Sequence, residues 1–111
     1  MRVKRIRKSE ELTNAKALAI LRELASTTQL TEEQRKTLDY LEKVAVRTPE
    51  EAENIVKQLV EKFGFTRITA IQLANLRIDN IDELRTVLSY LEKREYSESE
   101  LKEILKVLTG Q

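Results

Sequence analysis

Residues 37–52, TLDYLEKVAVRTPEEA, join two helix patterns with almost no chain between them. In the first pattern, apolar side chains recur at the spacing of one helix face, at Leu38, Leu41, Val44 and Ala45. Thr48-Pro49-Glu50-Glu51 then combines a capping hydroxyl, a proline where no amide bond is lost, and acids near the positive end of a helix dipole. The stretch predicts one helix ending near Val46 and another beginning after Thr48.

Similar signals divide the rest of the chain into helices. Starts are predicted near Ser9, at Thr31, at Thr66, at Asp79 or Asn80, and at Ser97. Thr31 and Ser97 each open a capping-box pattern, and Gly64 fits a left-handed helix end. Two glycines and one proline in 111 residues are too few for the many turns of a β-sandwich or barrel. We predict an all-α, single-domain bundle of about six helices over residues 9–111.

The residue inventory excludes most catalytic chemistry. The chain has no histidine and no cysteine, which removes the usual proton shuttle and the usual zinc ligands. Two glycines cannot build a phosphate-binding loop. Acids cluster at the helix starts near residues 50–53 and 79–83, where they favour the helix dipole far more often than they hold Mg²⁺. We therefore expect no catalytic residue, cofactor, metal or small-molecule substrate.

Charge is concentrated at the N-terminus, in a leader that we define as residues 1–8. Five basic residues and no acidic ones occur there, at Arg2, Lys4, Arg5, Arg7 and Lys8, whereas the remainder is net acidic. These side chains either contact nucleic acid or form a solvated tail, and the sequence leaves both interpretations open. Val3 and Ile6 are β-branched, so the leader could also pair as an edge strand with another chain. No apolar run reaches the length of a membrane span, and we expect a soluble, cytoplasmic protein.

Residues 17–21, ALAIL, are apolar without interruption. On a helix, five consecutive residues point around most of the circumference, so this helix should be covered on more than one side. It is either the central helix of the bundle, which spacing alone slightly favours, or a helix between its own domain and a partner. Tyr40 lies at the flank of a neighbouring apolar stripe, where it is either a partner contact or part of the peripheral core.

The order of these segments resembles a known family. LDYLEKVA at 38–45, PEEAENIVKQLVEKFGF at 49–65, LANL at 73–76 and IDELRTVL at 81–88 are similar to the smaller of the two stalk subunits of archaeal RNA polymerase, across about residues 9–91. That family is the counterpart of the smaller stalk subunit of eukaryotic RNA polymerase II. The resemblance implies a helical bundle like the C-terminal domain of RecQ-type helicases and RNase D. It also implies a non-catalytic subunit that pairs with a β-rich partner, the larger stalk subunit, and joins the core polymerase through it.

The resemblance further implies which residues meet the larger stalk subunit. The leader and the first helix make this contact in the family, so we predict a partner surface made of Val3, Ile6, Leu12, Ala15, Leu18 and Ala19. We add Tyr40, because a tyrosine beside an apolar stripe tolerates a half-wet interface. Such a stalk assists initiation, contacts emerging RNA, and supports elongation and termination. The alternative is a stand-alone helical nucleic-acid-binding module, which the acidic body disfavours because phosphate binding needs a basic face.

Overall fold

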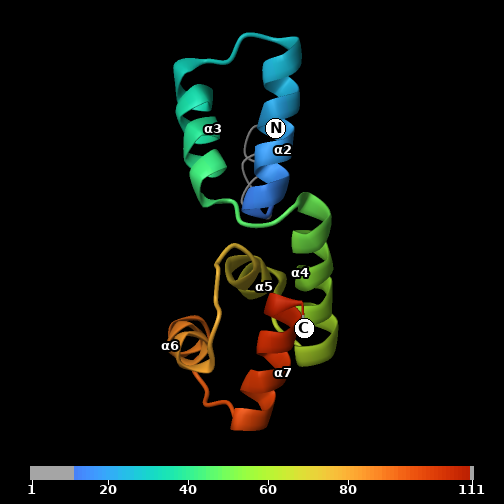
Figure 1. Ribbon diagram of the computed structural model, residues 1–111, viewed down its shortest axis with the longest axis vertical. Helices are drawn as coiled ribbons and strands as arrows, with labels where there is room; N and C mark the ends of the chain where they lie inside the picture. Colours follow the sequence, from blue (N-terminus) through green and yellow to red (C-terminus); the bar gives the residue numbers. More distant parts are fainter. Residues whose placement is uncertain (1–11, 111) are drawn as a thin grey trace.

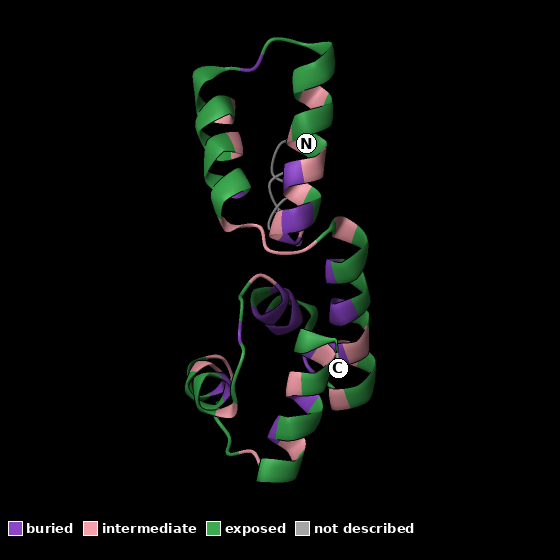
Figure 2. Ribbon diagram, in the orientation of Figure 1, coloured by how far each residue is buried: buried purple, intermediate pink, exposed green. Residues whose placement is uncertain are grey.

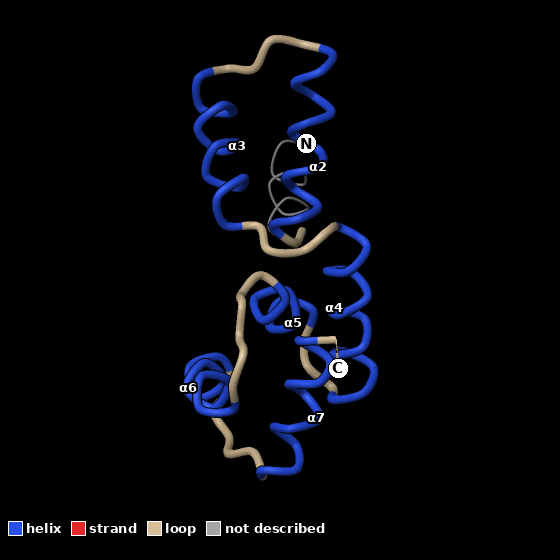
Figure 3. Tube along the Cα trace, in the orientation of Figure 1, coloured by secondary structure: helices blue, strands red, loops and turns tan. Residues whose placement is uncertain are grey.

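The computed structural model describes residues 12–110, and this part of the chain is helical without strands. Its six helices are α2 (Asn14–Thr27), α3 (Glu32–Val44), α4 (Pro49–Phe63), α5 (Arg67–Ala74), α6 (Ile81–Leu91) and α7 (Glu98–Thr109). Figure 3 traces these helices and the short loops that join them. The predicted all-α fold is confirmed. The leader, with its predicted strand and basic side chains, lies outside the described residues.

Local capping chemistry sets most helix boundaries. Thr31, Thr48 and Ser97 each form a complete capping box with the residue three positions later. Thr66 caps α5, and Asn80 rather than Asp79 caps α6. Gly64 ends α4 with φ 74°, a left-handed conformation that glycine adopts without steric cost. These boundaries were predictable because each depends on a few neighbouring residues.

The first described helix begins later than predicted. It starts at Asn14 instead of near Ser9, because Thr13 is the capping residue and its hydroxyl accepts a hydrogen bond from the Lys16 amide at 3.1 Å. The Asn14 amide donates to Oδ1 of Asn75, 61 residues away, at 2.8 Å. A tertiary contact thus helps to fix this boundary. The helix predicted to reach about Val46 ends at Val44.

The helices form two parts joined end to end. Helices α2 and α3 form a hairpin at one end, and α4 to α7 pack together at the other (Figure 1). The molecule measures 49 × 28 × 21 Å, with a Cα radius of gyration of 15.4 Å. A compact chain of this length would have a radius of gyration of about 13 Å. The fold is therefore elongated, and we call its two parts the hairpin (residues 14–44) and the body (residues 49–110).

The hydrophobic core belongs to the body. Its buried cluster draws on α4, α5, α6 and α7 and on the loops between them, and it includes Val56, Leu59, Leu73, Leu84, Leu101 and Ile104. Figure 2 shows buried residues concentrated in these helices, while most of the hairpin is exposed. Of the two positions left open for the 17–21 helix, the central one does not hold, because α2 lies in the hairpin, and α4 is the helix of the body that contacts α2, α5 and α7. Within α2, only Ala15 and Leu18 are buried.

Candidate partner-binding surface

Helix α2 carries apolar residues on two sides, and its own chain covers only one of them well. Ala15 and Leu18 are buried, but Ile20 has 44% of its surface exposed. At about 100° per residue, Ile20 lies roughly 140° around the helix from Ala15. Ala17 and Leu24 share the side of Ile20 and are half-buried. An apolar helix side that remains partly in water is typical of a surface that another protein covers.

Helix α3 adds a second partly covered apolar stripe. Leu41 is buried and anchors the hairpin, whereas Leu38 and Val44 are half-buried. Tyr40 has 60% of its surface exposed, so it is not part of the core. A tyrosine with an apolar ring and a polar hydroxyl suits a protein interface with access to water.

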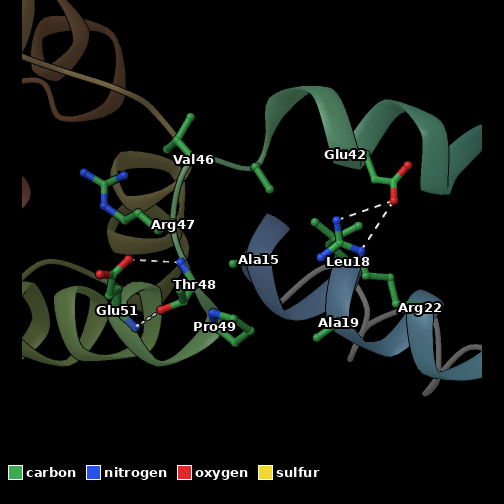
Figure 4. Close-up of a pocket in the computed structure, with 11 residues that line it drawn as sticks. Ala15, Leu18, Ala19, Arg22, Glu42, Val46, Arg47, Thr48, Pro49 and Glu51 are labelled. Atoms are coloured by element: carbon green, nitrogen blue, oxygen red, sulfur yellow. Dashed lines mark hydrogen bonds and ion pairs between the residues drawn. The ribbon is translucent and has the colours of Figure 1, made fainter.

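A shallow groove of about 400 Å³ separates the hairpin from the start of α4 (Figure 4). Small and apolar side chains line much of it: Ala15, Leu18, Ala19, Ala45, Val46 and Pro49. Arg22 of α2 and Glu42 of α3 form an ion pair at 3.4 Å along its wall, and both side chains are substantially exposed. Exposed ion pairs contribute at most about 1 kcal/mol. The groove is thus held by only a weak ion pair on this wall, and three of the predicted partner residues line it: Ala15, Leu18 and Ala19.

The joint between α3 and α4 contains a feature that sequence reasoning missed. The Arg47 guanidinium donates hydrogen bonds to the carbonyl oxygens of Ala74 at 2.6 Å, Leu76 at 2.9 Å and Leu108 at 2.6 Å. Burial lowers the pKa of Arg47, and the nearby Glu51 carboxylate opposes that shift. Arginine nonetheless remains protonated in proteins, so the charge is retained. These carbonyl acceptors lie 27 to 61 residues further along the chain, and no pattern in the sequence around Arg47 indicates them.

The predicted partner residues within the described chain divide into two groups. Ala15, Leu18 and Ala19 meet at the groove, where the first two are buried against their own chain and Ala19 is half-buried. Leu12 is half-buried just before α2, and Tyr40 lies on α3 outside the groove. The structure also adds Ile20, which the sequence did not single out. Its signal was present in the uninterrupted apolar run at 17–21.

The acidic clusters at the helix starts are engaged in structural contacts. Glu51 completes the capping box with Thr48, Glu53 pairs with Arg67 at 3.1 Å, and Asp82 pairs with Arg85 at 3.2 Å. Within residues 12–110, no three acidic side chains come together in a way that could hold a metal ion. None of the described helices is long and apolar enough to cross a membrane.

Comparison with known proteins shows which family the chain belongs to. The family model described as RNA polymerase Rpb4 matches residues 3–110. The chain belongs to the RNA polymerase Rpb4 family. The DNA-directed RNA polymerase subunit Rpo4 of Methanocaldococcus jannaschii is 32% identical over 105 residues, which cover 95% of this chain and 87% of that relative. The resemblance found from the helix segments is thereby confirmed.

The extent of the Rpb4 match bears on the surface described above. It includes the hairpin and the body, and it extends into the basic leader as far as Val3. The match to the Rpb4 family therefore covers both parts of this chain. A function for the chain has to account for both parts, including the hairpin that has little core of its own.

Proposed function

We propose that this chain is a non-catalytic stalk subunit of an archaeal RNA polymerase that forms a heterodimer with the larger, β-rich stalk subunit. Through that partner it would join the core polymerase, assist initiation, contact emerging RNA, and support elongation and termination. Membership of the RNA polymerase Rpb4 family supports the assignment to the polymerase. The observation that carries the pairing is the partly exposed apolar side of the hairpin.

The hairpin provides the contact surface in this proposal. Ile20, Leu24 and Tyr40 would lose water-accessible apolar area on binding, and burial of such area contributes about 25 cal/mol per Å² before the costs of association. Ala15 and Leu18 would support the surface from beneath, because their own chain already covers them. The leader would extend the contact, with Val3 and Ile6 toward the larger stalk subunit and the basic side chains available to RNA or to an acidic partner surface.

A stand-alone nucleic-acid module remains the competing proposal. Outside residues 1–11, the hairpin and body together are net acidic, and exposed acids repel phosphate. A partly exposed apolar hairpin side is also better matched to a protein than to a nucleic-acid backbone. The two proposals differ in what the isolated chain should bind, so an experiment can separate them.

The test is co-expression with the larger stalk subunit of the same polymerase. Gel filtration and thermal unfolding are then compared between the complex and the chain alone. A one-to-one complex with a raised melting temperature is expected, because a partner that binds only the folded state stabilises it. A folded chain that stays monomeric beside this partner, yet binds RNA in a salt-dependent way, would instead favour the nucleic-acid module.

Two isoleucines offer a matched pair of variants for the surface itself. Ile20 in the hairpin and Ile68 in the body are exposed at 44% and 63%, so glutamate should be tolerated at either position in the free chain. Ile20→Glu should weaken the complex by roughly tenfold or more, which corresponds to about 1.4 kcal/mol. Ile68→Glu should leave it unchanged. Equal effects of the two variants would remove the hairpin from the proposed interface.

A further inference from the structure

The connection between hairpin and body has little apolar packing to hold it. The buried core cluster contains side chains from α4 onward and none from α2 or α3. Among the described residues, a groove of about 400 Å³ lies where the two parts meet, next to the contact between α2 and α4. Close-packed interiors resist rotation of one element against another, whereas a gap does not. Within the described residues, polar contacts should therefore help to set the angle between the parts.

Among the described residues, hydrogen bonds at two places hold this connection. The Asn14 amide at the start of α2 donates to Asn75 Oδ1 at the end of α5. Arg47 in the joint reaches the carbonyl oxygens of Ala74 and Leu76 at the end of α5, and that of Leu108 near the end of α7. Arg47 thus ties the joint to two helices of the body at once, which the Asn14 contact does not do.

Two of the carbonyl groups that Arg47 reaches, those of Ala74 and Leu108, lie in the last turns of α5 and α7. The last carbonyls of a helix have no partner within it and lie at the negative end of its dipole. A guanidinium carries a positive charge and spreads its donors in a rigid plane, so one side chain can serve two helix ends in a fixed geometry. The Arg47 side chain is partly buried, which shields these contacts from water.

We propose that Arg47 is a positioning residue that holds the hairpin at a fixed angle to the body, so that the chain presents its partner surface already in the binding geometry. The part of this inference that concerns partner binding rests on the function proposed above. The part that concerns the angle does not, and the free chain alone can test it.

The decisive measurement is the distance distribution between two spin labels, one on each part. The chain has no cysteine, so Lys36→Cys on α3 and Lys102→Cys on α7, both exposed, give specific labelling sites. Double electron–electron resonance on the full chain should give a narrow distribution with Arg47 present. Arg47→Met keeps much of the apolar stem and removes every donor, so the distribution should broaden while the circular dichroism of the helices is retained. An unchanged width would overturn the proposal.

Two further variants sharpen the comparison. Arg47→Lys keeps the charge without the planar fork, so it should broaden the distribution to an intermediate degree, and it replaces Arg47→Met if that variant fails to fold. Arg85→Met is the matched control, because Arg85 pairs with Asp82 and Glu98 inside the body and does not cross the connection. Broadening of the same size in Arg85→Met would mean that any lost arginine loosens the fold, and the proposal would fail.

Binding of the larger stalk subunit then tests the second half of the inference. If only about a tenth of the Arg47→Met molecules hold the binding angle, the apparent affinity should fall about tenfold. Broadening without any loss of affinity would overturn the link between the angle and binding. Failure of the unaltered chain to bind this partner would instead count against the proposed function, and the label distances would stand independently.

Discussion

At the scale of single residues, polar contacts at helix ends add local stability that can be tested one side chain at a time. Glu100 illustrates this: its carboxylate accepts a hydrogen bond from the Ser97 amide at 2.9 Å and another from Arg94 at 3.1 Å. The Ser97 contact is the larger cause of a lowered pKa at Glu100, followed by the Arg94 contact. A carboxyl group with a lowered folded-state pKa stabilises the fold at neutral pH and loses that effect in acid.

Glu100→Gln should therefore show a pH-dependent effect on stability. Above the unfolded-state pKa of glutamate, the variant should melt below the unaltered chain, because it lacks the charged form that Ser97 and Arg94 stabilise. The difference should disappear as the pH falls through the lowered pKa of the folded state. Thermal unfolding across the acid range measures this, with Glu103→Gln as an exposed control on the same helix. A difference that stays constant with pH would contradict the assignment.

Gly64 gives a second prediction at this scale. Its φ of 74° is unfavourable for an L-residue, although an added Cβ would meet no atom within 4 Å. Gly64→Ala should thus cost roughly 1–2 kcal/mol from backbone conformation alone, measured by denaturant unfolding. Gly110→Ala is the control, because Gly110 has φ 78° and equally open surroundings but lies at the end of the last helix. It should cost less, because Gly64 is followed at once by the buried Phe65, which holds the left-handed turn in place.

At the scale of helices, the short joint between α3 and α4 depends on a local start signal. The Thr48 hydroxyl accepts from the Glu51 amide, and the Glu51 carboxylate accepts from the Thr48 amide, both at 3.1 Å. Thr48→Ala should lower the free energy of unfolding by about 1 kcal/mol, while Thr48→Ser should be nearly neutral because it keeps the hydroxyl. Equal losses in the two variants would indicate that the methyl group matters rather than the cap.

The leader can be tested as a unit. Deletion of residues 1–8 should weaken binding of the larger stalk subunit but barely shift the melting temperature of the free chain, because a leader with five basic residues is too charged to make a good core segment. Gel filtration and calorimetry on the same preparations measure both quantities. A large loss of helix signal in the deletion would mean that the leader belongs to the folded core.

Sequence reasoning predicted the helices far better than their arrangement. Capping boxes and apolar stripes are local, so the starts at Thr31, Thr48, Thr66 and Ser97 were all predicted. The start at Asn14 was missed because it depends partly on Asn75, far along the chain. The candidate surface was predicted in part: the apolar run at 17–21 indicated two-sided covering, but the spacing could not distinguish a central helix from one in a terminal hairpin.

At the scale of the whole molecule, the body and the hairpin differ in how well their side chains are buried. The body has a continuous buried core, whereas the hairpin has four buried apolar residues within or between its helices: Ala15, Leu18, Leu30 and Leu41. Arg47 is the clearest case of a feature that only the assembled structure reveals. Its acceptors are backbone carbonyls, which carry no residue identity that a sequence pattern could detect.

The hairpin, which buries few apolar side chains, should also unfold locally more readily than the body. Segments with few buried apolar contacts open at a smaller free-energy cost than the core of the same protein. Amide hydrogen exchange should accordingly be faster in α3 than in α4, by partial opening that leaves the body intact. Binding of the larger stalk subunit should slow exchange in the hairpin far more than in α5 or α6. Uniform exchange along the free chain would instead mean that hairpin and body open as one cooperative unit.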